Sequence, residues 1–214
     1  MVVPSSQVEY WNSVGLNKTF RHPVEYGWLD QLDRTARILD YGCGHGRLAG
    51  LLHEHGFTAV EGVDFAPAMI EAARQDNPGI RFTVLSDPPS LPFADGTFDA
   101  VTLFAVLTCI PSEAEQREVI AELRRVLRGG GLLYLSDLCV QSDDRTRARY
   151  EQHVEKYGTY GIFETDDGAV CRHNSRETLD ELLEDFSVVT SRDIAITSMN
   201  GSPTQATQVL ARKP

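Results

Sequence analysis

The chain has 214 residues, of which 42% are hydrophobic and 24% are charged, a composition ordinary for one soluble globular domain. Its formal net charge of −11 repels a phosphate backbone and therefore argues against a nucleic-acid substrate. The sequence has no basic–apolar leader and no apolar run of about 18 residues, so we expect a cytoplasmic protein with no membrane contact. Four scattered cysteines form neither C-x-x-C pairs nor metal-ligand spacings, which predicts no disulfide framework and no metal: Cys43, Cys109, Cys139 and Cys171.

The N-terminal segment carries one amphipathic pattern and one group of basic side chains. Apolar and aromatic residues recur at helical spacing and predict a short helix over residues 5–14. A second helix is expected over residues 23–32, because Pro23 suits the first position of a helix. Arg21 and His22 lie between the two and could hold an anionic group of a substrate. Ordinary solvated charge is the alternative interpretation.

A glycine-rich turn follows, between a strand pattern and a helix pattern. The apolar run at residues 36–39 predicts a buried strand, and the leucines of residues 48–52 share one helical face. The glycines between them, at alternate positions from Gly42, let a ligand approach the main chain. Arg47 stands where a dinucleotide-binding fingerprint would have its third glycine. The pattern predicts a nucleotide-type crevice, with a turn that only packs the helix as the alternative.

Two further strand patterns lead to acidic residues. Residues 58–64 read as a strand that ends in Asp64, whose carboxylate can accept both hydroxyls of a ribose. Pro67 begins the next helix. Residues 80–85 alternate apolar and polar side chains, which predicts a third strand, and Asp87 follows it.

The rest of the chain continues to alternate strands and helices and then ends in a hairpin. This order predicts an α/β fold with a doubly wound, mostly parallel sheet and an antiparallel edge. The expected elements are a strand over 98–104, a helix over 112–127 that ends at the turn glycines 129–131, a strand over 132–137, a helix over 143–157, a loop over 158–170, a helix capped by Asn174, and hairpin strands over 188–197 and 204–212.

Several of these stretches resemble motifs of the class I S-adenosylmethionine (SAM)-dependent methyltransferases. Asp40 with the G-x-G-x-G turn resembles motif I, and residues 62–74 resemble motif II. Residues 86–93 resemble the third motif, and residues 127–133 the post-motif. The resemblance covers residues 37–137 and the hairpin in outline. It implies the class I methyltransferase fold, which is a seven-stranded sheet with its last strand inserted antiparallel.

The resemblance also implies SAM as cofactor, S-adenosylhomocysteine (SAH) as product, and no metal. Asp40, Gly42 and Gly44 would hold the methionine end and Asp64 the ribose. Phe65 and Asp87 would hold the adenine. Pro88 departs from the third motif because it lacks the N–H that usually bonds the adenine ring. The remaining expected cofactor contacts are Cys43, Met69, Ser86 and Phe104.

In this family the parts outside the core usually surround the substrate. The resemblance therefore implies a single methyltransferase domain over residues 1–214, divided into a helical lid (1–35), a SAM-binding core (36–137), a substrate-pocket insertion (138–174), and a last helix with a β-hairpin (175–214). His173 and His22 are candidates for taking a proton, although His173 could equally be a hydrated residue at a helix start. Candidate substrate contacts are Tyr10, Trp11, Arg21, Thr108, Tyr150, Tyr160 and Arg172.

The function implied is methyl transfer from SAM to an O, N, C or S atom of a small-molecule acceptor. A metabolite or natural product with an anionic group is the type of acceptor considered, with neither a nucleic acid nor a membrane as partner. Two alternatives stay open, an NAD(P)-dependent oxidoreductase and a non-catalytic SAM-binding scaffold subunit. Whether the protein is a monomer or a homodimer is left undetermined.

Overall fold

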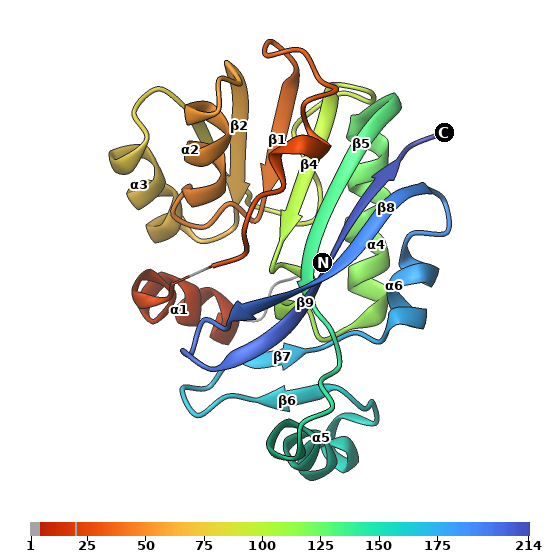
Figure 1. The fold of residues 1–214 in the computed structure, drawn as a ribbon. Coiled ribbons are helices and arrows are strands. Elements are labelled where there is room, and N and C mark those ends of the chain that lie inside the picture. Colours follow the sequence, from red (N-terminus) through yellow and green to blue (C-terminus); the bar gives the residue numbers. More distant parts are fainter. Residues whose placement is uncertain (1–4, 20) are drawn as a thin grey trace.

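A computed structural model of the chain describes residues 5–19 and 21–214, with side chains from residue 9 onward. Its main sheet has seven strands in the order β3-β2-β1-β4-β5-β9-β8 (Figure 1). The first five strands pair in parallel, and β9 lies antiparallel between β5 and β8. The predicted class I methyltransferase fold is thereby confirmed. The strands are β1 (Arg37–Tyr41), β2 (Ala59–Asp64), β3 (Arg81–Val84), β4 (Phe98–Phe104), β5 (Leu127–Leu138), β8 (Ser187–Thr197) and β9 (Pro203–Arg212).

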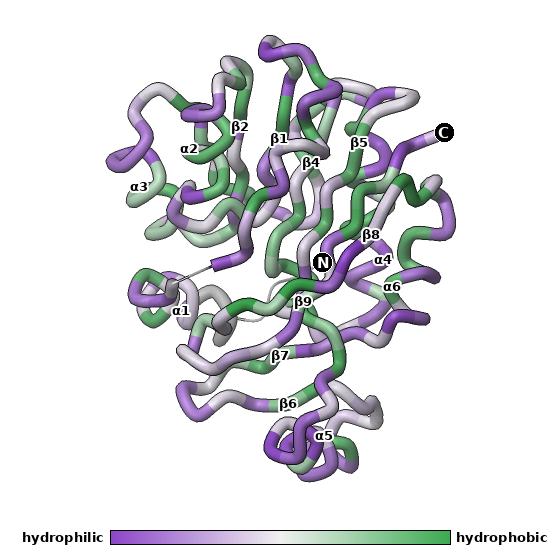
Figure 2. The backbone as a smooth tube through the Cα atoms, in the orientation of Figure 1, coloured by the Kyte–Doolittle hydropathy of each residue, from purple (hydrophilic) through white to green (hydrophobic). Residues whose placement is uncertain are grey.

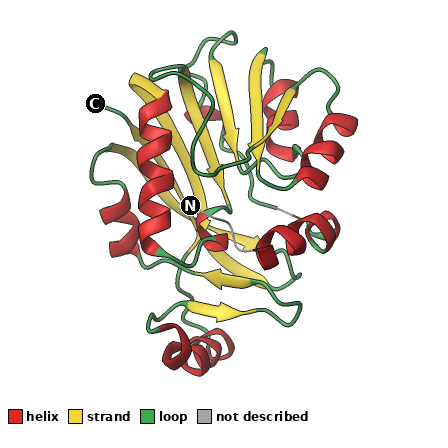
Figure 3. Ribbon diagram, turned by 180° about the vertical axis from the view of Figure 1, so that it is seen from behind, coloured by secondary structure: helices red, strands yellow, loops and turns green. Residues whose placement is uncertain are grey.

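Helices cover both faces of this sheet, and Figure 3 shows α4 crossing the face opposite to α2 and α3. On one face α2 (Arg47–Glu54) and α3 (Pro67–Asp76) bury apolar side chains against the strands. On the other, α4 (Glu113–Val126) and α6 (Arg176–Leu182) do the same. The predicted stripe of α4 is buried, and Ser112 caps the helix by accepting from the N–H of Glu115. Figure 2 shows the hydrophobic strands between these two layers.

The carboxyl ends of the parallel strands point toward the lower part of Figure 1, where the least regular parts of the chain gather. Below them lie α1 (Ser5–Ser13), the helix α5 (Asp144–Tyr157) and a second, two-stranded sheet. That sheet pairs β6 (Ile162–Glu164) with β7 (Val170–Arg172) inside the stretch expected to be a loop. Short 3₁₀ turns complete the chain at η1 (Gly15–Asn17), η2 (Tyr26–Trp28) and η3 (Leu107–Cys109).

Besides the loop expected over residues 158–170, three local predictions were wrong. The helix expected over residues 23–32 is only the turn η2, since the N–H of Glu25 donates to Tyr134 Oη at 3.0 Å and ties the segment to β5. Glycines 129–131 lie within β5 at an irregularity in its pairing with β4, where Gly130 takes a φ of +72°. The cap of α6 is Ser175, whose Oγ accepts from the N–H of Thr178 at 3.2 Å.

In the described part of the chain, no helix is both long and apolar enough to cross a membrane.

Candidate active site

The glycine turn after β1 forms one wall of a cleft of ≈ 90 Å³. Gly42 and Gly44 have φ angles of +70° and +53°, a region that favours glycine. A Cβ on Gly42 would come within 2.5 Å of Val106 Cγ2, whereas a Cβ on Gly44 would meet no atom within 4 Å. The backbone at Gly44 is thus open to a ligand. We call this space the glycine cleft.

Asp40 is the most unusual side chain of the glycine cleft. It is 2% exposed, and its Oδ1 accepts from Thr102 Oγ1 at 2.8 Å. Its Oδ2 has no hydrogen-bond partner among the described residues. Burial raises the pKa of Asp40 to about 7, although the charge of Arg47 opposes the shift. Oδ2 is also closed to solvent, and a cationic ligand group that reached it would supply the partner that it lacks among the described residues.

Asp64 at the end of β2 lines the same cleft, with both carboxylate oxygens bound to main-chain amides. Gly44 N donates to Oδ2 at 3.0 Å and Ala66 N donates to Oδ1 at 2.9 Å. Burial raises the pKa of this carboxyl, and the backbone bonds hold the charged form against that effect. Each oxygen keeps a further lone pair, so the carboxylate can also accept hydroxyl groups of a ligand.

A second and larger cavity of ≈ 630 Å³ lies between the sheet and the lower subdomain of α5, β6 and β7. The segment before β1, the start of α5, the β6–β7 turn and the β8–β9 turn all contribute to its lining. Ala105 and Cys109 line both this large cavity and the glycine cleft, so the two spaces adjoin there. Ala105 has a φ of +56°, a conformation that is strained for a residue with a side chain.

Most of the predicted cofactor contacts lie together around the glycine cleft. Ser86 and Asp87 do not, since both are exposed and line neither cavity. Trp11, expected at the substrate, lines the glycine cleft instead. The predicted cofactor contacts that line the cleft are Asp40, Gly42, Cys43, Gly44, Asp64, Phe65, Met69 and Phe104.

The predicted substrate and proton-transfer residues divide into two groups. Those that line the large cavity are Arg21, His22, Thr108 and His173. Those that line neither cavity are Tyr10, Tyr150, Tyr160 and Arg172.

Three members of the second group have identifiable partners, whereas Tyr160 is exposed. Tyr10 Oη donates to Asp167 Oδ2 at 3.3 Å. Tyr150 is fully buried and bonds to His173. Arg172 is 4% exposed, and its guanidinium donates to Pro111 O and Glu113 Oε2, each at 3.1 Å.

Residues 39–135 match a family described as a methyltransferase domain. A structure of a SAM-dependent methyltransferase from Methanosarcina mazei has the same fold, with a TM-score of 0.83 at 24% identity over 91% of this chain and 99% of its own. Residues 39–135 therefore match a methyltransferase domain, and the chain has the fold of the class I SAM-dependent methyltransferases.

Two curated relatives match part of this chain. The ribosomal protein L11 methyltransferase of Burkholderia cenocepacia is 30% identical over 150 residues, which are 70% of this chain and 46% of the relative. The demethylmenaquinone methyltransferase of Beutenbergia cavernae is 33% identical over 128 residues, which are 58% of this chain and 49% of the relative. The chain therefore spans about half the length of both relatives.

Sequence reasoning missed several residues that line the two spaces. Arg47 lines the glycine cleft, and Arg145 and Arg149 of α5 line the large cavity. The spacing of the two α5 arginines, one helical turn apart on an expected helix, was a usable signal. The β8–β9 turn, residues 197–204, also reaches the large cavity, which no local pattern indicates. Within the described residues, no group of three or more His, Cys, Asp or Glu side chains could hold a metal ion.

Proposed function

We propose that this methyltransferase transfers the methyl group of SAM to a small-molecule acceptor that carries an anionic group. The observation that supports this most is the contact of the two spaces at Ala105 and Cys109, which would let two bound molecules meet. The volume of the large cavity, ≈ 630 Å³, lies within the range of roughly 300–1,000 Å³ that is usual for small-ligand sites. One of the two relatives is named for demethylmenaquinone, although the other is named for a ribosomal protein.

The residues of the glycine cleft suit SAM. Asp40 Oδ2, which has no partner among the described residues and is closed to solvent in this structure, would accept the ammonium of the methionine part once SAM is bound, and the backbone at Gly44 would lie against that part. Asp64 would accept the ribose hydroxyls with its remaining lone pairs, and Phe65 and Met69 offer apolar surface for the adenine. Arg47 also lines the cleft, and its guanidinium donates to His22 O at 3.1 Å.

When bound, SAM would supply a methyl group on its sulfonium sulfur, and transfer of that methyl to the acceptor atom would break the carbon–sulfur bond and leave SAH. The chain must hold the acceptor atom in line with that methyl group, which is an orientation effect. Ala105 would lie where the two molecules meet, because it directly follows β4 and lines both spaces. Residues 138–174 would act as the substrate-pocket insertion, since residues of α5 and of the β6–β7 turn line the large cavity. The proposal that the N-terminal segment acts as a lid rests on Trp11, which lines the glycine cleft.

Three arginines support an anionic acceptor: Arg21, Arg145 and Arg149 line the large cavity, and in the described chain none of them forms an ion pair. Two of the aspartates that line the same cavity are already engaged. Asp167 is paired with Lys18, and Asp143 caps α5 by accepting from the N–H of Thr146. The charged groups that line the cavity without an ion pair in the described chain therefore include three guanidinium groups and the carboxylate of Asp166, so positive charge is in excess there.

Asp40 makes SAM binding depend on pH. Because its pKa is about 7 without ligand and a cationic ligand favours the carboxylate, affinity should rise as pH increases from about 5.5 to 7, by up to tenfold per unit. Calorimetric titration with SAH across this range measures the slope. The Asp40→Asn variant should bind more weakly and show a flatter slope. Burial also raises the pKa of Asp137 to about 7, but both proteins contain Asp137. The difference between their two slopes therefore reports on Asp40. Equal slopes would exclude this role for Asp40.

The proposed function is tested by incubating the protein with SAM and a panel of metabolites and detecting a methyl gain by mass spectrometry. Anionic acceptors should react, and Arg149→Gln should raise the KM for them by roughly tenfold or more without changing SAH affinity. Arg147→Gln is the matched control, because Arg147 lies on the same helix, does not line the cavity and is exposed. Reaction only with uncharged acceptors would contradict the anionic part. SAM binding with no methylated product would favour the scaffold alternative.

A further inference from the structure

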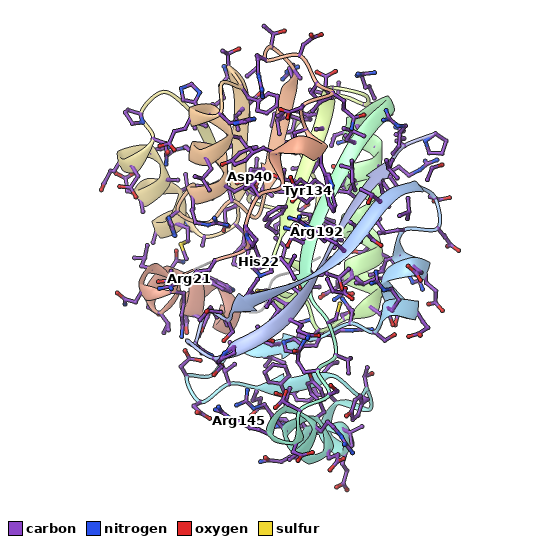
Figure 4. The ribbon with its side chains drawn as sticks, viewed as in Figure 1. Arg21, His22, Asp40, Tyr134, Arg145 and Arg192 are labelled. Carbon is purple, nitrogen blue, oxygen red and sulfur yellow. The ribbon has the colours of Figure 1, made fainter. Side chains whose placement is uncertain are left out.

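Two buried histidines reach the large cavity from different parts of the fold. His22 lies in the segment before β1, and His173 follows β7. They are 3% and 7% exposed, yet both line the cavity. Figure 4 shows His22 near the middle of the molecule, below Asp40 and above Arg145, with Arg192 close by in this view. The hydrogen bonds around each imidazole show which ring nitrogen carries the proton.

The proton on His22 is determined by a chain of hydrogen bonds that begins at the surface. Arg192 pairs with Glu25 and donates from Nε to Gln208 Oε1 at 2.9 Å. The amide oxygen of Gln208 is thereby identified, and its Nε2 donates to Pro23 O at 2.7 Å and to Ser136 Oγ at 3.3 Å. Gln208 is fully buried, so bulk water cannot replace these hydrogen-bond partners of its amide.

The hydroxyl of Ser136 must then give its own proton to another group. Among the described residues its two partners are Gln208 Nε2, which is a donor, and His22 Nδ1 at 2.7 Å. Ser136 Oγ therefore donates to His22 Nδ1, which accepts with its lone pair. In a neutral imidazole the other nitrogen then carries the proton, so His22 has its N–H at Nε2.

His173 has the same arrangement with a different partner. Its Nδ1 lies 2.6 Å from Tyr150 Oη. That oxygen also accepts from the N–H of Gln141 at 3.2 Å, and among the described residues His173 Nδ1 is the only acceptor for the hydroxyl proton, so we assign the proton to the bond with Nδ1. Tyr150 is fully buried, and burial holds the pKa of its hydroxyl well above the usual value, which keeps the proton on the oxygen. His173 therefore also carries its N–H at Nε2.

Neither Nε2 is used by the protein itself. In the part of the chain that is described, no hydrogen bond to His22 Nε2 or His173 Nε2 is present. The buried polar side-chain atoms without a partner belong to Asp40, Gln116 and Asn174, so the two histidine nitrogens are not among the atoms closed off inside the protein. Both side chains line the large cavity. The two Nε2–H groups are therefore open to that cavity and to whatever occupies it.

We propose that His22 and His173 are paired hydrogen-bond donors of the acceptor site, held in this state by Ser136, Gln208 and Tyr150, and that neither takes a proton in the reaction. The identification of the cavity as the acceptor site rests on the proposed function, whereas the proton positions do not. Ser136 and Gln208 are positioning residues for His22, and Tyr150 is the positioning residue for His173.

The charge state of both rings agrees with this assignment. Burial and the nearby charge of Arg47 lower the pKa of His22 to about 4. Burial and Arg149 lower the pKa of His173 to about 3, although Asp143 opposes the shift. Both imidazoles are then neutral at physiological pH, with the single proton at Nε2.

Two neutral donors and three arginines restrict the acceptor further. An acceptor that fits must present lone pairs at two places, such as carboxylate, carbonyl or phosphoryl oxygens. His22 is beside Phe104 of the glycine cleft, with the ring centroids 6.3 Å apart, so its partner atom would lie near the transferred methyl group. A hydrogen bond there would orient the acceptor, and any proton that leaves the nucleophile would have to go to a group other than these histidines.

Long-range ¹H–¹⁵N correlation spectra of the uniformly labelled, ligand-free protein test the proton positions directly. His22→Gln and His173→Gln assign the two rings among the six histidines. We expect both to show a protonated Nε2 and an unprotonated Nδ1 at pH 7, and to stay neutral down to about pH 5. A protonated Nδ1 on either ring, or a doubly protonated ring at pH 7, would overturn the proposal for that histidine.

Gln208→Glu tests the positioning chain, because the new carboxylate would accept the Ser136 proton. His22 should then switch its N–H to Nδ1, and His173 should not change. Tyr150→Phe should alter His173 and leave His22 as in the native protein. Gln205→Glu is the matched control, since it adds the same charge to the same strand at an exposed residue outside the cavity. An unchanged His22 spectrum in a folded Gln208→Glu protein would refute the chain. The spectra of the native protein do not depend on these variants or on any methylated product.

Discussion

Replacement of Asp64 by alanine should lower the affinity for SAM and SAH at least 100-fold. Its carboxylate lines the glycine cleft at the end of β2 and is proposed to accept two ribose hydroxyls. Hydrogen bonds to a charged group contribute about 1.5–3 kcal/mol each, and the loss of two corresponds to roughly 100-fold or more in affinity. The variant also loses the acceptor of Gly44 N, so the glycine turn itself would be less well held. Isothermal titration of both ligands measures the effect.

Asp87→Ala is the informative control for this experiment. The third-motif resemblance places Asp87 at the adenine, but its side chain is exposed and lines neither cavity. We therefore expect a change of less than about threefold in affinity, which is below 1 kcal/mol. Thermal unfolding of both variants shows whether the fold is kept. Near-native SAM affinity in Asp64→Ala would remove the ribose role, and a large loss in Asp87→Ala would restore the adenine role predicted from the sequence.

Arg172→Ala should destabilise the fold by about 2 kcal/mol while leaving the affinity for SAH unchanged. The guanidinium joins β7 to the start of α4 through Pro111 O and Glu113, and its side chain is 5% exposed. Its removal leaves the Pro111 carbonyl without this donor and leaves a gap beside β7. For a chain of this size the melting temperature should fall by roughly 4–8 °C.

Arg176→Ala provides the comparison for Arg172. Arg176 also forms an ion pair across elements, with Asp193, but the two side chains are 41% and 64% exposed. Exposed pairs contribute about 0–1 kcal/mol, so the melting temperature should hardly move. If Arg172→Ala were as stable as the native protein and had lost acceptor binding instead, Arg172 would be a substrate contact, as the sequence suggested, rather than a structural bridge.

The core of the fold could be predicted from the sequence because its signals are local. The strand at residues 37–41, the glycine turn and the helix that follows are adjacent in the chain, and their periodicity and φ requirements appear in the residues themselves. The same holds for Asp64, which ends a strand at a fixed distance from the turn. These features place the glycine cleft without any knowledge of distant contacts.

The large cavity could not be predicted in this way, because its walls meet only after folding. His22 and His173 are 151 positions apart in sequence, and their ring nitrogens depend on partners from β5, β9 and α5. Arg172 and Arg21 are alike in sequence, but one is buried against α4 and the other lines the cavity. The difference arises from which side of its segment each side chain faces after the β6–β7 sheet and the β8–β9 hairpin pack below the main sheet.

The sequence by itself determined the α/β class and the positions of the core strands and the glycine turn along the chain, since short-range sterics and side-chain periodicity decide these. The arrangement of the sheet and the role of Asp40 were implied by the resemblance to the class I methyltransferases. Only the tertiary structure decided which arginines are available to a ligand, which tyrosines are packing residues and where the protons of the two histidines lie. Those properties depend on burial and on hydrogen-bond partners contributed by distant strands, and no local pattern encodes them.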